Sequence, residues 1–223
     1  MPTFKIKKHN AVVGIIFFIG IAIMIGSLLT IMLMTPAAKK TASSNSAASN
    51  EIAIDVRNMD MGGEFTLSDT ANNEVTLQNL QGQFTLLYFG FTHCPDICPA
   101  SLVEMIGALE EFERLNGGKD KLQLVFVSVD PKRDTAAELH KYFENFDSRI
   151  MALTGTQEQI ADIAKKYKVY YSVAVDGKET TSDYLINHSS FLYLLDKNGK
   201  LIKYYTPGAT GHDIAKDIAA SSN

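Results

Sequence analysis

The pattern of apolar and polar positions divides the chain into one long apolar run and a larger region of alternating elements. Residues 11–34 form a run of 24 amino acids without a charged side chain. At about 1.5 Å per residue, a helix of this length crosses the roughly 30 Å hydrocarbon core of a bilayer with some tilt. The run therefore predicts a transmembrane anchor. The alternative is a cleaved signal peptide, whose apolar region would span only about 7–15 residues.

The sequence around this run indicates its orientation. Residues 1–50 carry no acidic side chain, and their lysines flank the run on both sides: Lys5, Lys7, Lys8, Lys39 and Lys40. Three lysines before the run and two after it favour a cytoplasmic N-terminus, residues 1–10, and a translocated C-terminal region. Small polar residues at 41–50 predict a flexible linker within residues 35–55.

Residues 56–223 alternate between strand-like and helix-like patterns. Runs of apolar, β-branched and aromatic residues predict strands at 65–67, 75–77, 84–90, 122–129, 150–153, 190–195 and 200–205. Apolar positions three and four apart predict helices at 99–115, 135–146, 156–167 and 212–220, with Asp134 or Thr135 as the N-cap of the second. This order predicts an α/β fold: a thioredoxin-like mixed sheet flanked by helices.

Composition narrows the function classes. The 223 residues have a net charge of −4, and residues 51–223 alone hold 16 basic and 25 acidic residues, a net of −9. A generally basic nucleic-acid binder is therefore excluded. Two cysteines are too few for a dense disulfide scaffold or for a zinc site with three or four cysteines.

Both cysteines lie in one turn between a predicted strand and a predicted helix. The stretch from Gly90 to Pro99 reads GFTHCPDICP, so Cys94 and Cys98 are four residues apart. On a helix this spacing puts two side chains on one face, where the sulfurs can bind one ion or form a disulfide. A helix N-terminus lowers the pKa of a thiol, so thiolates are expected here. Two buried structural cysteines are the alternative.

Two further stretches follow or precede predicted strands. Asp130 directly follows the strand predicted at 122–129, at the edge where α/β sheets bind ligands, although a simple turn with Asp134 as a cap also explains this stretch. His188 precedes the strand at 190–195, in the loop that faces the cysteine turn of a thioredoxin-like fold. Enzymes of that fold place a cis-proline there, and this loop contains no proline.

Together, Cys94, Cys98 and His188 would form a Cys₂His set. Soft sulfur ligands select Cu(I), and an imidazole also accommodates Cu(II). Structural zinc usually takes a fourth ligand, so copper fits better and zinc remains the alternative. Binding requires both thiols reduced, since a disulfide would abolish the site.

The three motifs together resemble the Sco/SenC family of copper chaperones. They are FGFTHCPDICP at 89–99, SVDPKRDT at 128–135 and YLINHS at 184–189, and the resemblance spans roughly residues 63–219. It implies a membrane-tethered thioredoxin-like domain that helps to assemble cytochrome c oxidase. The implied metal ligands are Cys94, Cys98 and His188, with Asp130 close to the metal but not bound to it. His93 is part of the motif and is not assigned as a ligand.

The implied partner is subunit II of cytochrome c oxidase, whose binuclear copper site would receive copper, have its cysteines reduced, or both. A copper donor protein and a thiol reductant are further implied partners. The expected location is an inner membrane, with the domain on the periplasmic side. The mitochondrial intermembrane space is the alternative, and the lack of an Arg-rich presequence favours a bacterial source.

Three other functions would use the same residues. A thiol–disulfide reductase would attack a partner disulfide with Cys94 and Cys98 and hold no copper. A thiol peroxidase would consume peroxide, and a sensor would bind copper without transferring it.

Overall fold

The computed structural model describes residues 52–174 and 184–222. These residues belong to the second of two compact units, Ser49–Asn223. The predicted anchor at 11–34 and most of the predicted linker lie outside the described residues, but Ala53–Asp55 at the linker's end form strand β1. Within the part of the chain that is described, no helix has the length and apolar character needed to cross a bilayer.

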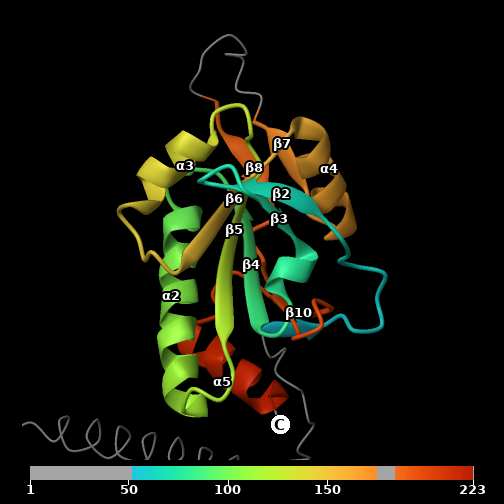
Figure 1. Cartoon of the computed structure of the whole chain (residues 1–223), viewed down its shortest axis with the longest axis vertical. Helices are drawn as coiled ribbons and strands as arrows, with labels where there is room; N and C mark the ends of the chain where they lie inside the picture. The colour runs from blue at the N-terminus through green and yellow to red at the C-terminus, as the bar shows by residue number, and fades with distance from the viewer. Residues whose placement is uncertain (1–51, 175–183, 223) are drawn as a thin grey trace, which may run out of the picture. The chain divides into compact units, whose positions relative to one another are not determined.

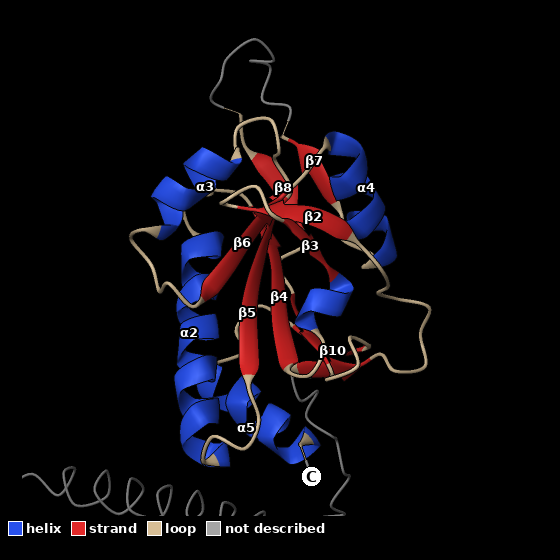
Figure 2. Ribbon diagram, viewed as in Figure 1, coloured by secondary structure: helices blue, strands red, loops and turns tan. Residues whose placement is uncertain are grey.

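A mixed eight-stranded sheet forms the centre of the fold (Figures 1 and 2). Its strands run in the order β1-β10-β9-β4-β5-β6-β2-β3. The strands are β1 (Ala53–Asp55), β2 (Thr66–Asp69), β3 (Glu74–Thr76), β4 (Phe84–Gly90), β5 (Leu122–Ser128), β6 (Ile150–Thr154), β9 (Leu192–Leu195) and β10 (Leu201–Tyr205). A separate antiparallel pair, β7 (Tyr171–Val173) and β8 (Ile186–His188), carries the histidine of the third motif.

The core of the sheet is parallel. Strands β4, β5 and β6 pair in parallel, and β9 joins β4 antiparallel. All seven residues of β4 are buried, as expected for a strand covered on both faces. The carboxyl ends of β4 and β5 therefore meet at one edge of the sheet, where the first two motifs begin.

Helices cover both faces of this core. On one face, Phe84 packs edge-on against Phe112 of α2 (Ile97–Asn116), and Phe126 lies against Phe143 of α3 (Ala136–Phe143). On the other face, Phe89 contacts Tyr167, the C-cap residue of α4 (Gln157–Lys166). The last helix, α5 (Gly211–Ser221), packs along α2.

The predicted α/β fold, a thioredoxin-like sheet flanked by helices, is confirmed. The strand at 84–90 has the predicted bounds, whereas α2 begins two residues before the predicted start. It can do so because a proline such as Pro99 is tolerated in the first helical turn. The predicted second helix ends earlier, at Phe143, and the strands β1, β7 and β8 were not predicted.

Candidate metal centre

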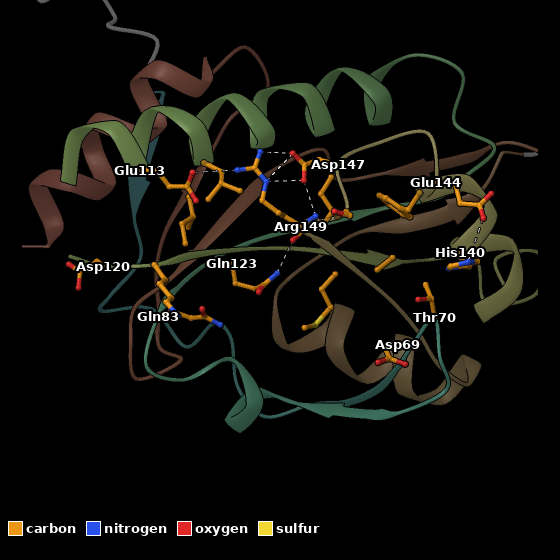
Figure 3. A pocket seen from close by; sticks show the side chains of 18 of the residues that line it. Asp69, Thr70, Gln83, Glu113, Asp120, Gln123, His140, Glu144, Asp147 and Arg149 are labelled. Atoms are coloured by element: carbon orange, nitrogen blue, oxygen red, sulfur yellow. Dashed lines mark hydrogen bonds and ion pairs between the residues drawn. The ribbon is translucent and has the colours of Figure 1, made fainter. Parts of the chain in front are cut away.

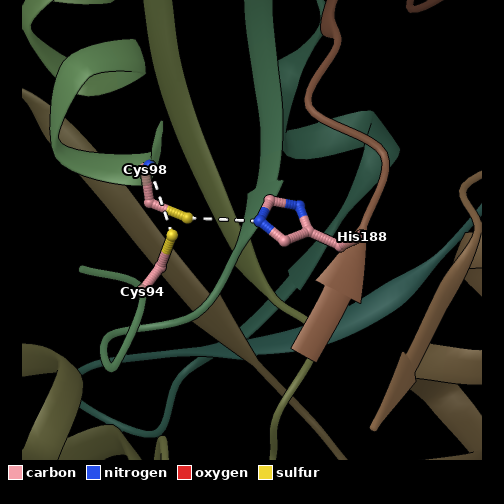
Figure 4. A group of neighbouring side chains, drawn as sticks. All are labelled: Cys94, Cys98 and His188. Carbon is pink, nitrogen blue, oxygen red and sulfur yellow. Dashed lines mark hydrogen bonds between the residues drawn. The ribbon is translucent and has the colours of Figure 1, made fainter. Parts of the chain in front are cut away.

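Three elements bring the predicted Cys₂His set together (Figure 4). Cys94 lies in the loop after β4, Cys98 lies in the first turn of α2, and His188 is the last residue of β8. Their two sulfurs and one ring nitrogen all lie within 4.8 Å of one another, and Cys98 Sγ is 3.4 Å from His188 Nε2. Among the described residues, this is the group of histidine, cysteine and acidic side chains close enough to hold one metal ion.

Both sulfurs are free thiols in a nearly dry site. Cys94 is 8% exposed and Cys98 is fully buried. The Cys98 amide donates to Cys94 Sγ at 3.4 Å, so the start of α2 supplies a donor to the first sulfur. Burial raises the pKa of the Cys98 thiol to about 12. The expectation of a thiolate from the helix N-terminus is therefore wrong for Cys98, because desolvation of the sulfur outweighs the helix dipole.

His188 presents an unprotonated nitrogen to the sulfurs. Its Nδ1 lies 3.1 Å from the carbonyl oxygen of Ser189, which can only accept, so Nδ1 carries the proton. Burial lowers the pKa of His188, and the ring is neutral at pH 7. The Nε2 lone pair is thus directed at Cys98 Sγ. Edge-on contacts with Tyr88 and Phe91 fix the ring in this orientation.

The end of β4 leaves space for the Cys98 sulfur. Alternate residues of β4 face α2, and two of them, Tyr88 and Gly90, lie beneath Cys98. A Cβ at Gly90 would stand 2.9 Å from Cys98 Sγ, so a larger residue would occupy the sulfur's place. The Tyr88 hydroxyl donates to the same sulfur at 3.6 Å. Tyr88 cannot be recognised as a site residue from the sequence, since its position in an apolar run gives only the signal of a core residue.

Asp130, predicted to lie close to the metal, is buried, but its side-chain partners are Arg133 and Tyr184. Arg133 Nε pairs with its carboxylate at 2.5 Å, and the Tyr184 hydroxyl donates to it at 2.7 Å. Arg133 also donates to the Tyr184 carbonyl at 2.8 Å and stacks on its ring at 3.6 Å. Asp130 is not one of the grouped donor residues Cys94, Cys98 and His188. Its contacts with Arg133 and Tyr184 hold the segment that leads to His188.

The sequence offers Asp134 or Thr135 as the N-cap of the second predicted helix. In the structure Thr135 caps α3, and its hydroxyl oxygen accepts from the Glu138 amide. Asp134 is instead fully buried and accepts from the Thr92 amide at 3.0 Å, from the Thr92 hydroxyl at 2.6 Å and from Ser128 Oγ at 2.6 Å. Thr92 precedes Cys94 by two residues, so Asp134 anchors the cysteine loop. His93 is half exposed, and its Nδ1 lies 3.0 Å from Thr92 Oγ1.

A wide cleft lies on another part of the described structure. It has a volume of about 1040 Å³ and is lined by α3 and by residues of β5, β6 and the loop before β6 (Figure 3). Arg149 at its wall pairs with Asp147 and bridges to Glu110 and Glu113. None of the predicted site residues lines this cleft. The Cys94, Cys98 and His188 group is therefore separate from this cleft.

The Cys₂His set fits a soft metal ion. Two sulfurs and one neutral imidazole converge with no carboxylate among them. Thiolate ligands select copper(I) and zinc over hard cations. A structural zinc ion takes four protein ligands, and this set provides only three. The donor chemistry thus favours copper(I).

The comparisons with known proteins agree on the family. Residues 55–223 match the family model described as SCO1/SenC. The chain is 38% identical over 200 residues to SCO2-like protein RC0895 of Rickettsia conorii, covering 89% of this chain and 92% of that protein. It is 41% identical over 160 residues to protein sco1 of Schizosaccharomyces pombe, covering 72% of this chain but only 60% of the relative.

Solved structures give the same result. Arabidopsis thaliana ScoI with copper bound matches with a TM-score of 0.67 at 36% identity, over 73% of this chain and 98% of that one. BsSco, a member of the Sco family of cytochrome c oxidase assembly proteins that was studied for a disulfide switch, matches with a TM-score of 0.54 at 25% identity, over 74% and 94%. The chain therefore belongs to the SCO1/SenC family.

Proposed function

We propose that this protein is a copper chaperone that binds copper(I) through Cys94, Cys98 and His188. The observation that carries the proposal is the convergence of the three donor atoms within 4.8 Å at a buried site. The copper-bound structure of the Arabidopsis relative supports the choice of metal. Copper(II) is the second oxidation state that this mixed sulfur and imidazole set accommodates.

The receiving partner in this proposal is subunit II of cytochrome c oxidase, with its binuclear copper site. The membership of BsSco in a family of cytochrome c oxidase assembly proteins supports this choice. The partner's cysteines would displace the chain's ligands one at a time. Cys94 is the more exposed of the two cysteines, so in this proposal it is the first that an incoming thiolate reaches. A copper donor protein and a thiol reductant complete the cycle.

The state of the site residues determines what loading requires. His188 is neutral and needs no deprotonation, because burial lowers its pKa. The Cys98 thiol must give up a proton, because burial raises its pKa to about 12. Loading therefore releases protons, and it occurs only while the two thiols are reduced.

We also propose that residues 11–34 anchor the protein in an inner membrane, with the domain in the periplasm. The uncharged run and its flanking lysines support this arrangement. A relative in Rickettsia supports a bacterial setting, and the mitochondrial SCO2 proteins among the relatives keep the intermembrane space as the alternative.

Metal analysis of the purified, reduced full chain tests the proposal. We expect one copper(I) per wild-type chain after desalting, and loss of most of it in Cys94→Ser and His188→Ala. His212→Ala is the matched control, because His212 is an exposed histidine bound to Glu111 on another part of the surface. Equal copper retention in wild type and both site variants would refute the Cys₂His site.

A thiol–disulfide reductase is the second candidate, favoured by the two free thiols that lie side by side. The described residues contain no cis peptide bond, so the cis-proline of thioredoxin-type reductases has no counterpart there. A pure reductase would reduce a subunit II disulfide equally well with and without copper(I) and would lose copper on desalting. A chaperone would keep its copper until the partner's reduced thiols are added.

A further inference from the structure

A buried tyrosine hydroxyl on β4 contacts one of the two sulfurs. Tyr88 is fully buried, and its hydroxyl donates to Cys98 Sγ at 3.6 Å. Leaving a buried hydroxyl without a hydrogen-bond partner costs folding free energy, so buried hydroxyls are normally paired with an acceptor. The acceptor that the structure gives this hydroxyl is the Cys98 sulfur.

Packing holds the hydroxyl in place. The Tyr88 ring lies against Phe126 and edge-on to His188, with centroid distances of 6.2 and 6.1 Å. Gly90, two residues along the same face of β4, leaves room for both the ring and the sulfur. Because close packing holds the buried ring within this core, the hydroxyl stays directed at the Cys98 sulfur of the reduced protein.

The two sulfurs therefore have different donors. Cys94 Sγ accepts from the main-chain amide of Cys98, which every residue except proline would supply at that position. Cys98 Sγ has a main-chain hydrogen bond from Phe91 and, in addition, accepts from a side chain, the Tyr88 hydroxyl. This second donor is specified by the sequence and can be removed by deleting one oxygen atom.

We propose that Tyr88 is a positioning residue of the site, whose hydroxyl stabilises the reduced Cys98 sulfur relative to the disulfide. This inference rests on the proposed function, in which Cys98 is a copper ligand. The disulfide takes up two electrons and two protons to give two thiols, and a thiol or thiolate sulfur accepts a hydrogen bond better than a disulfide sulfur. The Tyr88 hydroxyl thus favours the form that can hold copper.

The same hydrogen bond influences the oxidation state of bound copper. A donor to a ligand sulfur withdraws electron density from it, and hydrogen bonds to the ligand sulfur are a known control of copper redox potentials. Copper(II) gains more from sulfur electron donation than copper(I). The Tyr88 hydroxyl therefore favours copper(I), the state expected during transfer.

Tyr88→Phe tests the proposal, with Tyr205→Phe as the matched control. Tyr205 is a buried tyrosine whose hydroxyl donates to Asp217 at 2.8 Å, so its variant also loses one buried hydrogen bond, but away from the sulfurs. The metal-free proteins are equilibrated with reduced and oxidised glutathione, and the thiols are counted after alkylation. We expect the constant for disulfide formation to rise about tenfold in Tyr88→Phe, which is about 30 mV for this two-electron couple. The control should match wild type.

The copper-loaded proteins provide a second readout. In Tyr88→Phe the sulfur-to-copper(II) absorption band should move to longer wavelength, since the sulfur holds its electrons less tightly without the hydrogen bond. One copper per chain should still bind. If wild type holds no copper, the proposed function fails, while the glutathione equilibrium still decides whether Tyr88 acts on Cys98.

Should Tyr88→Phe fail to fold, wild type itself gives the answer by NMR with carbon-13 in the tyrosine rings. The Cζ resonance of Tyr88 should shift between the dithiol and disulfide forms, and that of Tyr205 should not. A glutathione equilibrium in Tyr88→Phe equal to that of wild type, or a Tyr88 resonance unchanged by oxidation, would overturn the proposal.

Discussion

Gly90, the last residue of β4, leaves the space into which the Cys98 sulfur fits. In Gly90→Ala the new Cβ would lie 2.8 Å from Phe126 Cε2, 2.9 Å from Cys98 Sγ and 2.9 Å from Tyr88 Cε1. Favourable carbon contacts are about 3.5–4.0 Å, so all three side chains must move, and all three are fully buried. Overpacking of this kind costs about 1–3 kcal/mol of unfolding free energy. The displaced sulfur would also leave its place 3.4 Å from His188 Nε2.

Thermal unfolding of the reduced, metal-free chain measures the first effect, and copper retention after desalting measures the second. At about 2–4 °C per kcal/mol, Gly90→Ala should lower Tm by several degrees. The matched control is Gly107→Ala in the interior of α2, where the new Cβ meets no heavy atom closer than 4.0 Å. A helix gains about 0.5–1 kcal/mol from this change, so Tm should rise and copper should be retained. A Gly90→Ala protein with wild-type Tm and wild-type copper retention would refute the argument that glycine is needed beneath the sulfur.

Three more predictions follow from the neighbouring contacts. Copper(I) affinity should rise with pH between 6 and 8 in a chelator competition, because the free chain keeps the Cys98 proton up to a pKa of about 12 and the bound chain does not. In Cys98→Ser the rise should be shallower by about tenfold per pH unit, since one proton fewer is released. Asp134→Ala leaves the Thr92 amide without its acceptor and should cost about 1–3 kcal/mol in urea unfolding, with partial recovery in Asp134→Asn. Arg133→Met leaves the buried Asp130 carboxylate without its cation and should cost about 3–5 kcal/mol, and an added Asp130→Leu change should restore much of that loss.

Local sequence signals predict the first half of the site well. The strand at 84–90 is a continuous apolar run, and the helix after it has regular apolar spacing, so the turn between them is fixed by its neighbours. Cys94 falls in that turn, and Cys98 falls in the first turn of the helix. Their proximity to each other thus follows from chain connectivity, and the structure confirms it.

The surroundings of His188 could not be predicted in the same way. The sequence pattern predicts His188 in a loop before a strand, whereas it ends β8, a strand of three residues paired with β7. Strands this short carry no readable alternation of apolar and polar residues. Tyr88 was missed for a different reason, because its hydroxyl acts within a run in which every residue is buried.

The second motif, at residues 128–135, is the least informative of the three in the sequence, but in the structure it connects the other two. Its Asp134 accepts the hydrogen bonds that hold Thr92, two residues before Cys94. Its Asp130 and Arg133 hold Tyr184, four residues before His188. The cysteine loop and the histidine strand are therefore both fastened to one short segment at the end of β5. Since this segment sets both ends of the site, changes in it should alter copper affinity without removing any of the three donor atoms, as a positioning role requires and a ligand role does not.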